Sequence, residues 1–297
     1  MKIAITGASG LIGGALTRSL EADGHEVLRL VRREPSGPGQ ARWRPGGSVD
    51  TEALEGCHAV VHLAGAGVGD RRWTERYKRQ IRDSRLTGTR TIATAVAGLS
   101  ARPAVFVCGS AIGFYGDTGD RDADEDAPQG GGFLARLVAD WEAAAAPAAD
   151  AGIRVVLPRT GVVLARAGGM LGTLLPLFRY GLGGRMGRGR NWVSWISLTD
   201  QIAALRFLID GDLSGPVNLT APAPVTNAQL TRAVARAVRR PAPWAVPPFA
   251  LRLAVGGFAD EGILISQRVV PRRLTEAGFT FTHTSVDAAV RKELALR

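Results

Sequence analysis

Three glycines near the start of the chain have the spacing of a phosphate-binding turn. They lie at positions 7, 10 and 13 of the segment TGASGLIG, after an apolar run at residues 2–6 and before apolar positions at helical spacing in residues 11–23. A turn of this kind brings backbone amides close to a pyrophosphate, and the helix N-terminus adds its positive end. The segment predicts a dinucleotide site rather than a glycine-rich turn without a ligand. The expected contacts are Gly7, Ser9, Gly10, Leu11 and Ile12.

Two arginines follow the second predicted strand, residues 26–31, and indicate which dinucleotide is bound. An acidic residue at this position binds the ribose 2′-hydroxyl of NAD, whereas a basic residue accommodates the 2′-phosphate of NADP. The chain has Arg32 and Arg33 here, and its first carboxylate is Glu34. Guanidinium groups pair well with phosphate, so we expect NADP(H). In the alternative interpretation both arginines are solvated surface charges.

The elements that must position these residues alternate between strand and helix. Such alternation predicts an α/β fold, a Rossmann-type doubly wound parallel sheet. We expect an NADP-binding domain over residues 1–165, with strands returning from later segments, and a smaller C-terminal α/β lobe on the substrate side over residues 166–297. Further strands are expected at 59–64, 104–108, 154–157 (ended by Pro158), 193–196 and 216–219, helices at 71–90, 134–149, 199–209 and 226–239, and a loop at 181–189.

Composition narrows the possible partners. The net charge of +10 is carried by arginines scattered from Arg18 to Arg297, which disfavours a nucleic-acid surface. No apolar run reaches the length of a membrane span and no signal peptide is recognised, so we expect a cytoplasmic protein with a small-molecule substrate and no membrane partner. The oligomeric state is left open. The two cysteines and four histidines lack metal-ligand spacing, and the carboxylates of residues 117–126 suit a solvated loop over the pocket, so no metal is expected.

Several motifs resemble the extended short-chain dehydrogenase/reductases. Beyond residues 6–13 they include HLAGA at 62–66, GSAIGFYG at 109–116, PRTGVVL at 158–164 and PVNLTAP at 216–222. More narrowly, the whole chain is similar to the atypical branch called epimerase family protein, or SulA-like. The resemblance implies a cofactor path along the strand ends. Its expected residues are Leu63, Ala64, Gly65, Gln80, Arg85, Arg159 and Val162.

The catalytic pattern of the ordinary family members is missing. They use Tyr-x-x-x-Lys on one helix face, where the lysine lowers the tyrosine pKa. Here the residues four positions after Tyr77, Tyr115 and Tyr180 are isoleucine, glycine and glycine, and residues 133–138 read FLARLV. The resemblance leaves Ser110 to orient a substrate oxygen and Tyr115 as a proton donor. Without a nearby lysine, the pKa of Tyr115 is expected to stay near its free value of about 10.

Two functional hypotheses follow. One is an NADP(H)-binding oxidoreductase or epimerase-like enzyme of the atypical extended type, with an unidentified small-molecule substrate. The other is a catalytically silent NADP(H)-sensing regulatory or interaction protein, since the Tyr/Lys pair is lost and some members of the similar branch carry a cell-division-inhibitor label.

Overall fold

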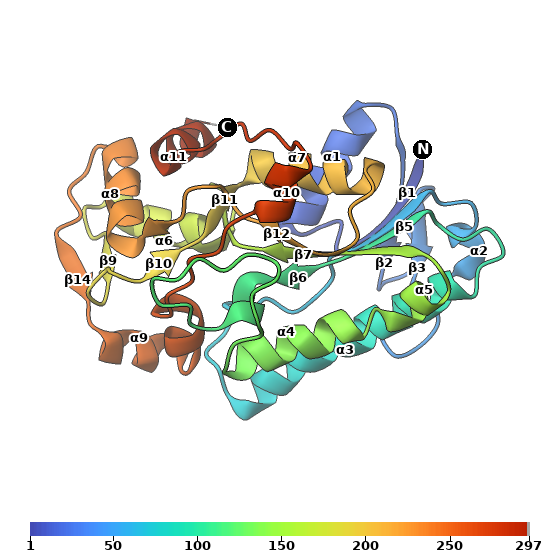
Figure 1. The fold of residues 1–297 in the computed structure, drawn as a ribbon, viewed down its shortest axis with the longest axis horizontal. Coiled ribbons are helices and arrows are strands. Elements are labelled where there is room, and N and C mark those ends of the chain that lie inside the picture. Colours follow the sequence, from blue (N-terminus) through green and yellow to red (C-terminus); the bar gives the residue numbers. More distant parts are fainter. Residues whose placement is uncertain (296–297) are drawn as a thin grey trace.

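One parallel sheet forms the frame of the computed structural model, which describes residues 1–295 (Figure 1). Its strands run in the order β12-β7-β5-β4-β1-β2-β3, and β6 also pairs with β7. The pairings are parallel, and the order reverses at β1 and β4. The strands are β1 (Lys2–Thr6), β2 (Glu26–Val31), β3 (Gln40–Arg42), β4 (Ala59–His62), β5 (Val105–Cys108), β6 (Ser110–Ala111), β7 (Arg154–Thr160) and β12 (Gly215–Leu219). The predicted Rossmann-type α/β fold is confirmed.

Apolar side chains along each strand point alternately to the two faces of this sheet, and helices cover both faces. Ile3 and Ile5 pack in one core with α1 (Leu11–Ala22) and α7 (Leu198–Asp210). Ala4 points into the opposite core, which also contains side chains of α3 (Glu75–Ala97), α4 (Phe133–Ala143) and α5 (Ala146–Asp150). Figure 1 shows α3 and α4 side by side on that face. The short helix α2 (Thr51–Leu54) precedes β4.

The C-terminal lobe packs around a third core on the other side of the molecule from α2 and β3 (Figure 1). Its small sheets pair β8 with β11, β9 with β14 and β10 with β13. Its helices are α6 (Gly169–Arg179), α8 (Asn227–Val238), α9 (Pro248–Val255), α10 (Arg272–Glu276) and α11 (Val286–Ala295). Its strands are β8 (Val162–Leu164), β9 (Gly184–Met186), β10 (Trp192–Val193), β11 (Trp195–Ser197), β13 (Val225–Thr226) and β14 (Trp244–Val246). Two short turns complete the fold, η1 (Ile112–Tyr115) and the π-helical η2 (Ala259–Ile263).

The prediction that Pro158 ends a strand is wrong, because β7 continues to Thr160. The Gly161 amide donates to Leu219 O on β12, so alternation along β7 turns the Pro158 nitrogen to the opposite side. On that side β5 pairs as far as Val156 and β6 begins opposite Arg159. Proline therefore falls in the gap between β5 and β6, where the strand needs no amide donor.

Three other element predictions are wrong in detail. The alanine-rich segment 134–149 is two helices, because Pro147 in the first turn of α5 has no N–H to continue α4. The glycine-rich segment 181–189 contains β9, and a Cβ on Gly184 would lie 2.6 Å from Trp244 O, so this glycine permits close strand pairing. Residues 193–196 are divided between β10 and β11. Within residues 1–295, no helix is both long and apolar enough to cross a bilayer.

Candidate functional site

The glycine turn between β1 and α1 leaves no room for side chains. Gly7 has a φ of +71°, and a Cβ there would lie 2.9 Å from the carbonyl carbon of Leu63. A Cβ on Gly13 would lie 2.2 Å from Gly7 O. The amides of Leu11 and Ile12 in the first turn of α1 have no intrahelical acceptor. Among the described residues no side chain caps this helix, so these amides are available to a ligand. Ser9 and Gly10 are exposed beside them.

Thr6 holds the ends of β1 and β4 together next to this turn. Its Oγ1 accepts hydrogen bonds from the amides of Leu63 and Ala64, at 3.1 and 3.2 Å. The hydroxyl proton is then left for His62 Nδ1, 2.8 Å away. This places Leu63 and Ala64 directly beside Gly7, as the sequence prediction requires.

His62 is fully buried behind the turn, and this burial lowers its pKa to about 3. Between about pH 6.5 and about pH 3, His62 is therefore protonated in the unfolded chain and neutral in the folded chain. The stability from neutral His62 is fully present above that range and is lost as the pH falls, by about 1.4 kcal/mol per pH unit. In His62→Asn, where the amide oxygen replaces Nδ1 as acceptor, urea unfolding from pH 7 to 4 should show a correspondingly flatter decline. Parallel declines in both proteins would contradict this assignment.

Arg32 and Arg33 are exposed just beyond the end of β2. Neither guanidinium has a hydrogen bond or ion pair within residues 1–295. The nearest carboxylate in sequence, Glu34, forms an ion pair with Arg42 of β3 instead. Two cations thus lie at the end of the second strand, and no carboxylate of residues 1–295 pairs with them.

Arg85 belongs to α3, and its guanidinium group lies next to Gly65. Its Nη1 donates to Ala66 O at 2.8 Å and to Ile81 O at 3.3 Å, and its guanidinium carbon is 4.9 Å from the Trp141 ring centroid. Burial lowers the pKa of Arg85 to about 10, which leaves it charged at neutral pH. Gln80 is exposed on the same helix and makes no hydrogen bond in the described part of the chain. The structure therefore brings Gly65 and Arg85 together, but not Gln80.

Ser110 and Tyr115 belong to a buried polar network at the ends of β6, β7 and β12. Ser110 Oγ donates to Glu142 Oε1 at 2.6 Å, and Arg159 binds both oxygens of Glu142 at 2.8 and 2.9 Å. Arg159 also donates to the Tyr115 hydroxyl at 3.0 Å, which in turn donates to Asn218 Oδ1 at 2.7 Å. All three guanidinium nitrogens of Arg159 are therefore used inside the protein.

Tyr115 departs from the expected pKa near 10. Burial raises the pKa of Tyr115 to about 12, against the opposing effect of Arg159. Because its proton is already donated to Asn218, the phenol is a poor proton donor for a substrate.

Val162 is half-buried on β8, where its amide donates to Ser194 O at 2.8 Å.

Glu142 and Asn218 were not predicted as site residues. Glu142 lies four residues after Val138 and seven after Ala135, both buried, so it continues the apolar stripe of α4. A carboxylate on an apolar stripe requires a buried partner, and this is the signal that could have identified it. Asn218 gives no comparable signal in the sequence.

The acidic segment 117–126 is largely exposed, but its contacts hold it against the rest of the protein. Glu125 is buried and accepts a hydrogen bond from the Asn218 amide at 2.9 Å. Further contacts tie the segment to the C-terminal lobe: Asp120 with Trp192, Asp122 with Arg268, and Asp124 and Asp126 with Arg272. Arginines thus pair with Asp122, Asp124 and Asp126, and residues 1–295 contain no cluster of three potential metal ligands.

The sheet order, the glycine turn and the serine that begins β6 define a Rossmann protein of the extended short-chain dehydrogenase/reductase type. The sequence model of the NAD dependent epimerase/dehydratase family matches residues 3–219, and the chain belongs to this family. A second model, a domain of unknown function named DUF1731, matches residues 246–293.

Similar proteins carry the name epimerase family protein. One from Mycobacterium tuberculosis is 52% identical over 97% of this chain and 96% of its own length. Bovine epimerase family protein SDR39U1 is 36% identical over 99% of this chain and all of its own. The crystal structure of human epimerase family protein SDR39U1 (isoform 2) with NADPH matches with a TM-score of 0.92 and 32% identity over the full length of both chains.

Proposed function

We propose that this chain is an NADP(H)-binding oxidoreductase or epimerase-like enzyme that acts on a small molecule. The observation that carries the proposal is the pairing of a cradle that a Cβ would fill, at Gly7 and Gly13, with two uncompensated guanidinium groups at the end of β2. A pyrophosphate fits the first feature and a 2′-phosphate fits the second. The NADPH in the human SDR39U1 crystal structure supports the same cofactor here.

Each part of the cofactor has residues to hold it. The segment from Gly7 to Ile12 binds the pyrophosphate. Arg32 and Arg33 bind the 2′-phosphate. The segment 63–65 follows the adenosine side, and Arg85 borders it from α3, whereas Gln80 is exposed on the same helix and is not part of this group. Arg159 and Val162 lie at the strand ends assigned to the nicotinamide side. When bound, the nicotinamide supplies the group that donates or accepts hydride.

Ser110 is the side chain that meets the substrate oxygen in this proposal. Its proton is directed at Glu142, so its oxygen is free to accept a hydrogen bond from a substrate hydroxyl. A proton received by Ser110 can pass to Glu142, whose charge Arg159 otherwise balances. Tyr115, proposed from the sequence as a proton donor, serves here to hold Arg159 in place.

The proposal extends to the domain division and to the cellular compartment. Residues 1–165 form the cofactor-binding part and residues 166–297 the substrate-side lobe, although β12 (Gly215–Leu219) returns to the central sheet. Cys57 and Cys108 are free and buried, which supports a reducing compartment such as the cytoplasm.

The silent NADP(H)-sensing protein is the second candidate, and one observation favours it. Leu137 and Val138 are buried on α4, in the segment where the Tyr-x-x-x-Lys pair belongs. A panel of carbonyl and alcohol substrates followed at 340 nm separates the two candidates. Turnover that is lost in Ser110→Ala supports the enzyme. NADPH binding with no turnover, together with a protein partner whose affinity NADPH changes, supports the sensor.

Cofactor choice can be tested at the end of β2. Arg32→Ala/Arg33→Ala should weaken NADPH binding by at least roughly a hundredfold, because charged hydrogen bonds to the 2′-phosphate contribute about 1.5–3 kcal/mol for each arginine removed. NADH lacks that phosphate, so its affinity should stay unchanged. Calorimetry with both nucleotides measures the difference. Arg102→Ala is the matched control, since this exposed arginine precedes β5 at the amino edge of the sheet. Equal losses for NADPH and NADH would refute the assignment.

A further inference from the structure

Large apolar side chains are exposed together on the C-terminal lobe. Tyr180 is 82% exposed and Leu253 is 74% exposed, although residues of these types are normally at least half-covered. Apart from Met1, the exposed large hydrophobic residues among residues 1–295 all come from the end of α6, the segment after it, β14 and α9. They are Leu177, Tyr180, Leu182, Trp244, Phe249 and Leu253, and we call them the apolar face.

A side-chain hydrogen bond and strand pairing connect the segments that carry these residues. Trp244 Nε1 donates to Gly181 O at 3.2 Å, which ties β14 to the residue that separates Tyr180 from Leu182 in the chain. The strand that carries Trp244, β14, pairs with β9 and continues into α9, where Phe249 and Leu253 are one helical turn apart. Figure 1 shows β14 and α9 at one extreme of the molecule.

The same lobe contains a block of unbalanced positive charge. Residues 166–199 and 213–259 hold ten arginines and no Asp or Glu, which equals the whole net charge of +10. Within residues 1–295, Asp287 pairs with Arg236 and Asp260 pairs with Arg252. Arg179, Arg185, Arg188, Arg239 and Arg240 are exposed in or next to the segments that carry the apolar face.

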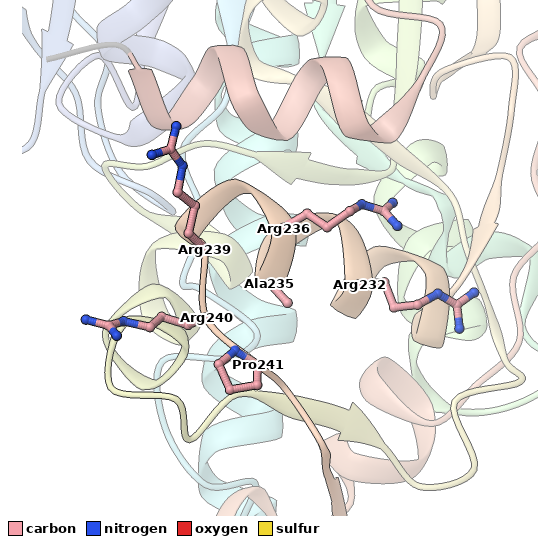
Figure 2. Close-up of a pocket in the computed structure, with 6 residues that line it drawn as sticks. All are labelled: Arg232, Ala235, Arg236, Arg239, Arg240 and Pro241. Carbon is pink, nitrogen blue, oxygen red and sulfur yellow. The ribbon is translucent and has the colours of Figure 1, made fainter.

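The arginines near the end of α8 line a hollow of about 390 Å³. Figure 2 shows that the side chains of Arg232, Arg236, Arg239 and Arg240 do not converge on one point, since the first two extend to one side and the others to the opposite side. A single bound anion needs several donors aimed at it. Spread charges suit an extended surface that carries many negative groups.

The composition of this surface selects its occupant. A second copy would oppose positive charge with positive charge. Nucleic acid would use the arginines and aromatic rings, but it offers no partner for the aliphatic side chains Leu177, Leu182 and Leu253. We propose that this surface binds an anionic lipid bilayer, with the apolar face entering the interface and the arginines contacting lipid phosphates and carboxylates. The sequence prediction of no membrane partner rested on spanning segments, which such peripheral binding does not need.

Vesicle sedimentation with the full chain tests the proposal. The protein should bind phosphatidylcholine vesicles that contain phosphatidylserine, should bind pure phosphatidylcholine weakly, and should be released by high salt. Phe249→Ser/Leu253→Ser should reduce binding tenfold or more, given about 1.5–3 kcal/mol for each buried side chain. Arg239→Glu/Arg240→Glu should reduce it by at least roughly fivefold for each arginine.

A variant with the same charge change elsewhere in the chain serves as the control. Arg90→Glu/Arg102→Glu makes the same charge change outside the lobe and should bind vesicles nearly as the parent does. All variants should keep their melting temperature and their NADPH affinity, because the changed side chains are exposed and far from the glycine turn. Equal binding to neutral and anionic vesicles would overturn the proposal. So would tighter binding to a DNA duplex at the same salt, or self-association that Leu253→Ser abolishes.

Discussion

Replacing Arg159 with methionine should lower the free energy of unfolding by about 3–5 kcal/mol, the usual cost of leaving a buried charge without its partner. The side chains of Arg159 and Glu142 are only 4% and 11% exposed, and Glu142 would lose both of its guanidinium hydrogen bonds. The Tyr115 hydroxyl would also lose its donor. Urea unfolding, with the midpoint and slope measured separately, gives the free-energy change.

A neighbouring ion pair supplies the control for this prediction. Arg82 on α3 also pairs with a carboxylate of α4, Asp140, but these two side chains are 50% and 52% exposed and 3.4 Å apart, so Arg82→Met should cost no more than about 1 kcal/mol. The double variant Glu142→Gln/Arg159→Met removes both buried charges and should be more stable than Arg159→Met alone. If Arg159→Met costs no more than Arg82→Met, the buried network does not hold the strand ends together.

The features that were predicted from sequence depend on short stretches of chain. The glycine turn, α1 and the arginines after β2 follow from backbone geometry and local charge within residues 1–33, so the fold class could be predicted and was confirmed. The capping box at Thr226 and Gln229 is equally local, and α8 begins where the sequence places it.

The buried network could not be predicted in the same way, because its members are far apart in sequence. Tyr115 and Asn218 are 103 residues apart, and Glu125 reaches the Asn218 amide across 93 residues. The prediction of a solvated acidic segment treated residues 117–126 alone. It therefore missed Arg268 and Arg272, which follow much later in the chain and pair with three carboxylates of that segment. Pro158 was misread for a related reason, since its effect depends on which neighbouring strand faces its nitrogen.

Gly13→Ala should weaken NADPH binding at least roughly tenfold, which is the effect of losing one charged hydrogen bond to the pyrophosphate. The new Cβ would lie 2.2 Å from Gly7 O and 2.8 Å from the Gly7 carbonyl carbon. Backbone cannot yield as a flexible side chain can, so α1 must move away from the turn whose amides bind the phosphates. The same overlap should cost about 1–3 kcal/mol of stability.

The adjacent glycine separates the effect of position from the effect of residue type. A Cβ on Gly14 would meet Ala8 O at 3.3 Å, which a shift of a few tenths of an ångström relieves. Gly14→Ala should therefore keep NADPH affinity within about threefold, because alanine also favours the helix by up to about 1 kcal/mol and offsets the contact. Calorimetry on both variants, after thermal unfolding has shown that each is folded, makes the comparison. Tight NADPH binding by folded Gly13→Ala would mean that the first turn of α1 does not contact the pyrophosphate, and the proposed cofactor site would fail with it.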